Sequence, residues 1–549
     1  MNAAPVVTVE NLAVDFDTPA GVVSALDGIS FSVATGEVLG IVGESGSGKT
    51  VACQSLMRLL PSNARVRSGR IQFEGRDLLS APEAELARIR GERIAMIFQN
   101  PSTHLDPLMR VGRQVGEALR FHHGVGPTEA RRQAISLLAE MRINNPDQRV
   151  DSYAHELSGG MRQRVMIAAA LACKPALLLA DEPTTALDVT IQAQILGLIR
   201  ALRREREFSI VLVSHDLGVI AEMCDRVLVM RRGEIVEDGP VRDVIARPKH
   251  AYTGQLVASQ PSLMPSAPSA TSARDPLLVL DHVSVAFPQH RSLIGLVSGQ
   301  ARSSIRAVDD VSLTVRKGET LGIVGESGSG KSTLARAIVG LAPLNAGRIA
   351  FEGRAVTNLK GADRLSFKQS VQMVFQDPFT SLNPAFTVAQ TLAEPLKQHR
   401  MCPAAQLPAR ITELMQDIEL PPDLLLRRSG QLSGGQRQRV GIARALALQP
   451  KLIIADEVTS ALDVTIQAQI LGLFRKLREL MDLTLVLISH DLGVVRHLCE
   501  RVAVMRQGRV IEFGPTPEIF ANPKEQYTRD LLAAIPRIAA AETFGTATG

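Results

Sequence analysis

The sequence predicts two α/β domains in tandem, each built on a mainly parallel sheet. The first observation is an internal duplication, because LSGGMRQRV begins at Leu157 and LSGGQRQRV at Leu432. Within each copy, short runs of Val, Ile and Leu alternate with longer helical patterns, which is typical of a buried parallel sheet with crossover helices. Two β-hairpin patterns, turning at residues 232–233 and 507–508, predict some antiparallel structure in each copy.

The duplication also predicts the domain boundaries. Residues 1–260 form the first predicted domain and residues 277–536 the second. The stretch 261–276 between them is rich in Pro, Ser and Ala and lacks apolar periodicity, which predicts a linker. Residues 537–549 are predicted to be a flexible tail. The second copy carries an insertion, which we place in the polar stretch 288–304 as a surface loop.

Composition excludes several classes of protein. The 549-residue chain has 45% apolar and 21% charged residues, which excludes a wholly disordered chain, a collagen-like repeat and a coiled-coil rod. A net charge of +5 is small for this length, so we expect no nucleic-acid partner. The five Cys include no C-x-x-C pair, which argues against disulfides, a zinc site and an iron–sulfur centre.

No segment predicts secretion or a membrane span. The N-terminus lacks a basic start followed by an apolar core, which a secretory signal would need. The longest apolar run, residues 165–173, is well short of the roughly 18 residues of a membrane helix. We therefore expect a cytoplasmic protein that contacts a membrane only through partners.

Two glycine-rich segments predict phosphate-binding loops. Residues 43–50 and 325–332 both match G-x-x-x-x-G-K-[ST], each after an apolar run and before a helical pattern. In such a loop, backbone N–H groups face the phosphates, the lysine neutralises their charge and the Thr or Ser hydroxyl binds Mg²⁺. The alternative is a glycine-rich turn without a ligand, but it would have to occur twice in the same context. The predicted ATP-binding residues of these loops are Gly43, Ser45, Gly46, Gly48, Lys49, Thr50, Gly325, Ser327, Gly328, Gly330, Lys331, Ser332 and Thr333.

Each copy also contains an apolar strand that ends in adjacent carboxylates, Asp181-Glu182 and Asp456-Glu457. The first carboxylate of each pair is predicted to engage Mg²⁺, and the second to polarise the water that attacks the γ-phosphate. An acidic strand end that caps the next turn is the alternative. The phosphate loops upstream favour the catalytic interpretation.

With these motifs the chain resembles the ATP-binding-cassette family over nearly all of both copies. The resemblance implies two tandem P-loop NTPase domains, each with a mainly parallel-sheet core, an antiparallel β subdomain and a helical subdomain that carries the signature. LSGGM and LSGGQ resemble its signature, whose residues would contact the γ-phosphate of ATP held by the opposite cassette. Those residues are Ser158, Gly159, Gly160, Ser433, Gly434 and Gly435. Met161 stands where the family usually has glutamine, but the phosphate-facing residues of the signature are kept.

Other positions take roles that the resemblance implies. Gln99 and Gln376 look like the glutamines that sense Mg²⁺ and the transport partner, and they are therefore added to the predicted ATP and Mg²⁺ ligands. The resemblance also places further residues in the family's nucleotide-binding site. They are the switch histidines His215 and His490, the aromatics Phe16 and Phe287 beneath adenine, and the D-loops 186–188 and 461–463. A buried structural phenylalanine is the alternative for each aromatic.

The family's two cassettes pack head to tail, so that each ATP lies between one phosphate loop and the opposite signature. Because neither catalytic glutamate nor switch histidine is replaced, we expect two hydrolytic sites. The predicted Mg²⁺ ligands are Thr50, Gln99, Asp181, Ser332, Gln376 and Asp456.

Two further segments resemble dipeptide, oligopeptide and nickel importers. Residues 100–119 and 377–396 resemble the part that receives a coupling helix from each permease, and residues 247–259 and 522–534 resemble the C-terminal tails. An amphipathic surface helix is the alternative for the tails, and we expect no catalytic role for their tyrosines.

This resemblance implies a subunit at the cytoplasmic face of the inner membrane that drives peptide import. Its partners would be two integral-membrane permeases and an extracytoplasmic substrate-binding protein. Nickel, glutathione or another small solute is the alternative cargo, and an exporter also stays open. A ribosomal ATPase is disfavoured by the Pro/Ser/Ala linker, and a DNA-repair ATPase by the absence of zinc-binding cysteine pairs.

Overall fold

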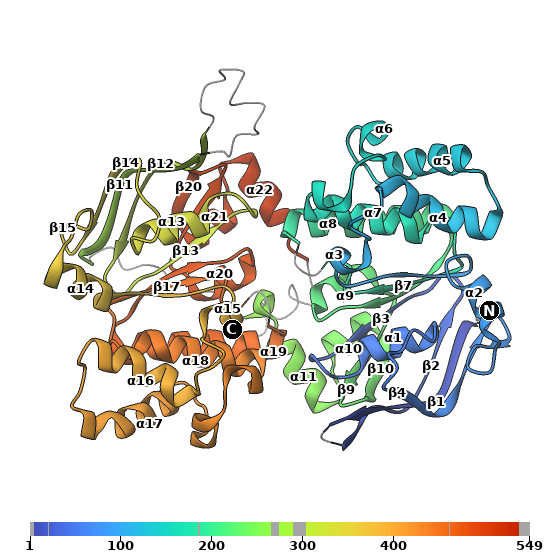
Figure 1. Cartoon of the computed structure of the whole chain (residues 1–549), viewed down its shortest axis with the longest axis horizontal. Helices are drawn as coiled ribbons and strands as arrows, with labels where there is room; N and C mark the ends of the chain where they lie inside the picture. The colour runs from blue at the N-terminus through green and yellow to red at the C-terminus, as the bar shows by residue number, and fades with distance from the viewer. Residues whose placement is uncertain are drawn as a thin grey trace, which may run out of the picture. The chain divides into compact units, whose positions relative to one another are not determined.

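The computed structural model describes residues 5–19, 21–184, 187–264, 274–288, 304–459 and 462–536. The chain divides into two compact units (Figure 1). The first consists mainly of residues up to Leu263, and the second mainly of residues 264–462 and 466–535. The insertion at 288–304 and the tail at 537–549 lie largely or wholly outside the described residues, as does most of the linker at 261–276, so these boundaries stay predictions.

Each unit contains a four-stranded antiparallel sheet with the same strand order. In the first unit the order is β2-β1-β4-β5, and in the second it is β12-β11-β14-β15. The long strands of both sheets contain buried and exposed residues along their length, as expected when only one face is fully covered. Their bounds are β1 (Pro5–Thr18), β2 (Gly21–Ala34), β4 (Ala64–Phe73), β5 (Arg76–Asp77), β11 (Pro276–Pro288), β12 (Ser304–Arg316), β14 (Ala346–Phe351) and β15 (Arg354–Ala355).

Each unit also contains a six-stranded, mainly parallel sheet, which confirms the predicted fold class. The orders are β10-β9-β3-β8-β7-β6 and β16-β17-β18-β13-β19-β20. Among the described strands of these two sheets, only the hairpins β9–β10 and β19–β20 pair antiparallel, at the two turns that the sequence predicts. The bounds are β3 (Val38–Val42), β6 (Ile94–Ile97), β7 (Leu177–Asp181), β8 (Ser209–Val213), β9 (Arg226–Arg231), β10 (Glu234–Pro240), β13 (Thr320–Val324), β16 (Val371–Val374), β17 (Leu452–Asp456), β18 (Thr484–Ile488), β19 (Arg501–Arg506) and β20 (Arg509–Pro515).

The helices of each unit pack against its parallel sheet or against one another (Figure 1). In the first unit they are α1 (Lys49–Leu56), α2 (Glu83–Ile89), α3 (Pro101–His104), α4 (Val111–His123), α5 (Pro127–Glu140), α6 (Pro146–Arg149), α7 (Gly159–Ala170), α8 (Val189–Arg206), α9 (Leu217–Met223), α10 (Val241–Ala246) and α11 (Ala251–Ala258). The second group comprises α13 (Lys331–Ile338), α14 (Gly361–Ser370), α15 (Pro378–Ser381), α16 (Val388–Gln398), α17 (Leu407–Asp417), α18 (Gly434–Leu446), α19 (Val464–Met481), α20 (Leu492–Leu498), α21 (Thr516–Ala521) and α22 (Gln526–Ala533). No helix of the described residues is long and apolar enough to cross a bilayer.

The central strand β3 shows how each parallel sheet buries both of its faces. Val38 and Val42 belong to a core that includes residues of α4, α5, α7 and α8. Leu39 and Ile41 belong to the core shared with the antiparallel sheet. Because side chains alternate along a strand, one short apolar segment can serve two cores. Packing on both faces therefore holds β3 in place, so residues 43–50, which follow it, begin at a fixed position.

One glycine fixes the pairing of β14 with β11. Gly347 has a φ of 85°, and an added Cβ would lie 2.2 Å from the His282 carbonyl oxygen. Gly353 has a similar φ of 77° in the turn before β15, but an added Cβ would meet nothing within 4 Å. The two positions therefore separate the cost of a left-handed backbone from the cost of a clash.

We predict that Gly347→Ala destabilises the second unit more than Gly353→Ala does. Gly353→Ala should cost about 1 kcal/mol for its left-handed backbone, whereas Gly347→Ala should cost roughly 2 kcal/mol more because β11 must move. Urea unfolding of the full chain, combined with hydrogen exchange of β14, measures the difference. Equal losses in the two variants would show that the contact with His282 does not constrain the sheet.

Candidate nucleotide-binding sites

Both phosphate loops connect the end of a buried central strand to the start of a helix. α1 begins directly after Gly48, which has a φ of 101°, and α13 directly after Gly330, which has a φ of 103°. Neither helix has a side-chain cap or an acidic residue in its first turn. The amide N–H groups of a first helical turn have no intrahelical acceptors. Both loops therefore fit an anionic ligand such as the phosphates of ATP.

The lysine of each loop folds back onto the loop backbone. Lys49 Nζ donates to the carbonyl oxygens of Gly43 and Glu44, both at 2.8 Å. Lys331 Nζ repeats these bonds at 2.8 and 2.9 Å. The two lysines are only 6% and 4% exposed. Burial lowers the pKa of Lys49, although the nearby carboxylates of Glu182 and Asp181 act in the opposite direction.

The hydroxyl that follows each lysine meets the first carboxylate of the acidic pair. Thr50 Oγ1 donates to Asp181 Oδ1 at 3.2 Å, and Ser332 Oγ donates to Asp456 Oδ1 at 3.0 Å. Burial raises the pKa of Asp181 to about 6 and also raises the pKa of Asp456. A hydroxyl and a carboxylate held together are hard oxygen ligands of the kind that Mg²⁺ prefers. The residues therefore fit the predicted metal at both sites.

Glu182, which directly follows β7, has a left-handed backbone with a φ of 46°. Its N–H donates to the carbonyl of Val213 on β8 at 3.0 Å, so the strained residue is fixed at the end of the sheet. Its carboxylate accepts from Gln99 Nε2 at 2.7 Å and lies 3.4 Å from His215 Nδ1. Burial acts to lower the pKa of His215, but the hydrogen bond and the charge of Glu182 outweigh it and raise that pKa.

Glu457 repeats this arrangement in the second unit. Its φ is 47°, and its N–H donates to the Ile488 carbonyl at 2.9 Å. Its carboxylate accepts from Gln376 Nε2 at 2.7 Å and lies 3.6 Å from His490 Nδ1. The hydrogen bond with His490 lowers the pKa of Glu457, against the effect of burial. In both units the glutamine therefore contacts the glutamate, a pairing that the sequence did not predict.

Each signature motif begins a helix. Ser158 is the N-cap of α7, and its Oγ accepts from the Met161 N–H at 3.3 Å. Ser433 caps α18 in the same way, but there Gln436 Oε1 also accepts the Ser433 N–H at 3.0 Å, which completes a capping box. A Cβ on the second signature glycine would lie 2.9 Å from Ile191 in the first unit and 2.6 Å from Ile466 in the second. Gly160 and Gly435 therefore let α7 and α18 approach the following helix of their own unit.

The two predicted adenine aromatics lie on the long strands of the antiparallel sheets. Phe16 on β1 pairs with Val23, and Phe287 on β11 pairs with Ile305. Phe16 is partly buried against the core, whereas Phe287 is 43% exposed. The strands β2 and β12, which pair with them, also reach the phosphate loops. A Cβ added to Gly48 would meet the carbonyl of Ala25 on β2. A Cβ added to Gly330 would meet the carbonyl of Ala307 on β12.

The D-loops are described only in part. Ala186 and Ala461 lie outside the described residues. Leu187 and Leu462 pack against the cores of their own units, and Asp188 is the N-cap residue of α8.

Two family models match this chain. A family model described as ABC transporter matches residues 26–185 and 308–460. The chain belongs to the ABC transporter family. A second model, oligopeptide/dipeptide transporter C-terminal region, matches residues 236–277 and 511–548, where the sequence resembles the importers' tails. As a member of this family, the chain is an ATP-binding ATPase coupled to transport, as the sequence predicts.

Relatives match over nearly the whole chain. It is 44% identical over 544 residues to the peptidoglycan transport ATP-binding protein YejF of Agrobacterium fabrum, covering 99% of this chain and 98% of that protein. It is 43% identical over 561 residues to the glutathione import ATP-binding protein GsiA of Pectobacterium atrosepticum, covering 97% and 89%. The dimeric structure of the cassette MJ0796 with ADP and Pi has 27% identity and a TM-score of 0.40, and covers 43% of this chain and 98% of that one.

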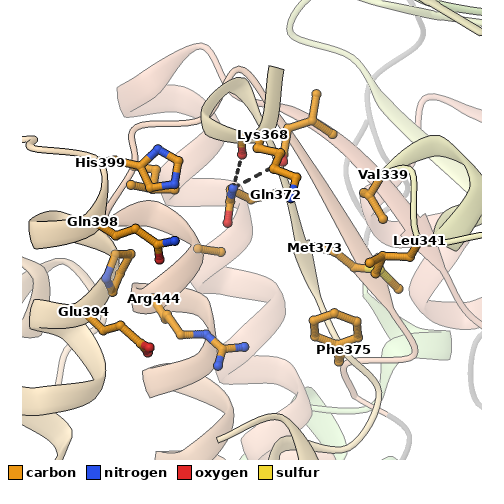
Figure 2. A pocket seen from close by; sticks show the side chains of 14 residues that line it. Val339, Leu341, Lys368, Gln372, Met373, Phe375, Glu394, Gln398, His399 and Arg444 are labelled. Carbon is orange, nitrogen blue, oxygen red and sulfur yellow. Dashed lines mark hydrogen bonds between the residues drawn. The ribbon is translucent and has the colours of Figure 1, made fainter. Parts of the chain in front are cut away.

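A groove of about 390 Å³ in the second unit of this transport ATPase is lined in part by Phe375, the residue before Gln376 in the sequence (Figure 2). Val339, Met373 and Phe375 form an apolar wall, and Glu394 and His399 of the segment around α16 face it from the other side. Another groove, of about 810 Å³, lies in the first unit. Its lining combines two apolar residues, Leu108 and Met109, with the charged residues Asp106, Arg110, Arg113, Arg120, Arg131 and Asp151. Both grooves include residues of the segments predicted to receive permease helices.

The sequence interpretation missed one pair of residues at these sites. Tyr252 and Tyr527, in the C-terminal helices α11 and α22, accept backbone N–H groups of the phosphate loops. A signal was available, because two of the three tyrosines in the chain occupy equivalent positions of the two copies.

We predict that the residue at the third helical position of each signature helix controls fraying of that helix. Gln436→Met should remove half of the capping box, at a cost of about 1 kcal/mol, and accelerate hydrogen exchange at Ser433. Met161→Gln should complete a capping box and slow exchange at Ser158. Unchanged hydrogen exchange in both variants would mean that the hydrogen bond from the serine N–H to the glutamine side chain does not stabilise the start of either helix.

Proposed function

We propose that this chain is the ATPase subunit of an importer for peptide-class solutes and hydrolyses two Mg-ATP per cycle. The observation that carries the proposal is that each unit contains a complete set of catalytic groups with nearly equal geometry. The Gln–Glu contacts are both 2.7 Å, and the hydroxyl–aspartate contacts are 3.2 and 3.0 Å. Such agreement supports two active sites rather than one active and one degenerate site.

In each site the loop would hold the β- and γ-phosphates, with Lys49 or Lys331 against their charge. Mg²⁺, when bound, supplies further neutralisation of the charge that develops on the leaving phosphate. Thr50 and Asp181 would hold this ion in the first unit, and Ser332 and Asp456 in the second. Gln99 and Gln376 are close enough to the glutamates to join either the metal or the attacking water.

Glu182 and Glu457 would each accept a proton from the attacking water, and His215 and His490 would contact the γ-phosphate beside them. The strained backbone of each glutamate supports this role, because it fixes the carboxylate before the substrate arrives. The six predicted signature residues would complete the site of the opposite cassette. Phe16 and Phe287 would lie beneath adenine. Joining both cassettes in one chain raises the effective concentration of each for the other.

We further propose two integral-membrane permeases as partners, each inserting a short helix into one of the two grooves. In the second unit, the apolar wall that faces Glu394 and His399 is suited to an amphipathic helix. The groove of the first unit combines apolar Leu108 and Met109 with several charged side chains. An extracytoplasmic binding protein would supply the solute, and this chain would act at the cytoplasmic face of the inner membrane. The names of the relatives, both for transport ATP-binding proteins, support this assembly.

The cargo that we propose is a peptide. The match to the oligopeptide/dipeptide C-terminal region in both copies favours it. Glutathione is a specific second candidate, because a relative that is 43% identical is named for glutathione import. No observation of the described residues favours nickel.

We predict that Glu182→Gln and Glu457→Gln each lower ATP turnover to half or less, and that the double variant lowers it at least about 100-fold, because proton acceptance from water is lost. ATP binding should persist in the double variant, as equilibrium titration would test. Glu207→Gln is a matched control, since Glu207 also has a left-handed φ, 54°, but lies at the end of α8. Full turnover in either single variant would show that its site does not hydrolyse ATP.

We also predict that the double variant, purified with Mg-ATP from gently solubilised native membranes, brings two multi-span permeases with it. Blocked hydrolysis should retain ATP and hold the assembly together. Mass spectrometry identifies the partners, and transport assays with peptides and glutathione then separate the two cargo candidates. Recovery of ribosomal proteins without a permease would contradict the importer proposal.

A further inference from the structure

Each cassette ends in a helix that returns to its own phosphate loop. The Tyr252 hydroxyl on α11 accepts the backbone N–H of Glu44 at 3.0 Å. The Tyr527 hydroxyl on α22 accepts the N–H of Glu326, also at 3.0 Å. Glu44 and Glu326 are the second residues of the two loops, so the same contact is present in both units.

The bonded peptide is the one against which the loop lysine rests. The peptide between Gly43 and Glu44 is trans, so its C=O and N–H groups point in opposite directions. Lys49 Nζ donates to this C=O at 2.8 Å, and Tyr252 accepts from the N–H on the other side. The tyrosine hydroxyl therefore limits rotation of this peptide plane, whose carbonyl oxygen accepts a hydrogen bond from the lysine ammonium.

Both tyrosines are held in place from several directions. Tyr252 is 3% exposed and Tyr527 is 8% exposed. The guanidinium of Arg231 lies 4.9 Å from the centre of the Tyr252 ring, and that of Arg506 lies 4.8 Å from the Tyr527 ring. Burial raises the pKa of the Tyr252 phenol, so the hydroxyl stays neutral at physiological pH. The ring has little freedom to move its hydroxyl away from the loop.

The start of each C-terminal helix is fixed by a buried carboxylate of the preceding hairpin. Glu237 on β10 accepts the N–H groups of Lys249 and His250 at 3.0 and 3.1 Å. Glu512 on β20 does the same for Lys524 and Glu525 at 2.8 and 3.3 Å. Two independent hydrogen-bond sets therefore bring the helix, and with it the tyrosine, to a defined distance from the loop.

We propose that Tyr252 and Tyr527 are positioning residues for the two phosphate loops, so that docking of each C-terminal helix sets the ATP affinity of its own cassette. This inference rests on the proposed role of the loops in binding ATP. A loop whose N–H groups converge on phosphate binds better when its peptides are oriented in advance. The C-terminal region is thus part of the nucleotide site, and a partner that displaced the helix would weaken ATP binding.

The test uses Tyr252→Phe and Tyr527→Phe in the full chain, since phenylalanine keeps the ring and its stacking on arginine but removes the accepting oxygen. The expected result is an increase of about three- to tenfold in the KM for ATP of the affected site, with kcat changed less than about twofold. Hydrogen exchange without nucleotide should rise in the altered loop, residues 43–48 or 325–330, and not across its unit.

A helix-level variant separates positioning from packing. Glu237→Gln weakens the attachment of α11 while keeping the Tyr252 hydroxyl, and it should raise the same KM. Its effect should be smaller in the Tyr252→Phe background than in the wild-type chain, because both changes act on one contact. Ser259→Ala is the matched control, because it removes a hydroxyl at the end of α11 that donates to the Gln255 carbonyl of the same helix at 2.8 Å, and it should leave the KM unchanged.

Two results would overturn the inference. The first is unchanged ATP affinity and unchanged loop exchange in both phenylalanine variants. The second is a loss of thermal stability with increased exchange throughout the unit, which would indicate a packing role only. The variant Lys49→Met separates this inference from the proposed function. If ATP still binds to the first site of this variant, the proposed role of the loop in ATP binding fails. If Lys49→Met abolishes ATP binding there but the tyrosine variants have no effect, only the positioning role is overturned.

Discussion

Each unit depends on one constraint, which is a buried lysine ammonium at the start of a helix. The lysine is Lys49 in α1 and Lys331 in α13. An unpaired buried charge is strongly destabilising, so the surrounding chain must supply partners. Two loop carbonyls accept from each ammonium, and in the second unit Glu457 lies 4.0 Å from Lys331. The acidic pair comes from the end of one strand, β7 or β17, which is separated by β8 or β18 from the strand that precedes the loop. The parallel order of the sheet is therefore what brings the acidic pair to the loop. The antiparallel sheet closes the other side of the loop.

The duplication shows which features this constraint fixes and which it leaves free. The loop, the acidic pair, the glutamine, the histidine and the C-terminal tyrosine have nearly the same distances in both units. The capping box is not repeated, because Met161 lacks the side-chain acceptor that Gln436 provides. The insertion before the second loop is likewise present in one copy only. Divergence therefore lies in how the helices start and in the surface segments, whereas the groups around the lysine stay constant.

The sequence was sufficient to predict the fold class and both hairpin turns, because each depends on a local pattern. β9 and β10 flank the predicted turn at 232–233, and β19 and β20 flank the one at 507–508. Contacts between distant segments could not be read from local patterns. The bond from Glu44 to Tyr252 spans 208 residues, and the contact of Gln99 with Glu182 spans 83. The left-handed backbone of Glu182 is also a tertiary effect, since glutamate has no local preference for it.

The hairpin of each unit connects the C-terminal helix to the nucleotide site. In the first unit Arg231 stacks on Tyr252, Gly233 N–H donates to the Ser47 carbonyl at 3.0 Å, and Glu237 holds the start of α11. One rigid element thus contacts the ring, the loop and the helix together. The match to the oligopeptide/dipeptide C-terminal region begins at residue 236, within β10, and again at residue 511, within β20. The family-specific region therefore starts inside the element that touches the phosphate loop, so it is structurally continuous with the ATPase core.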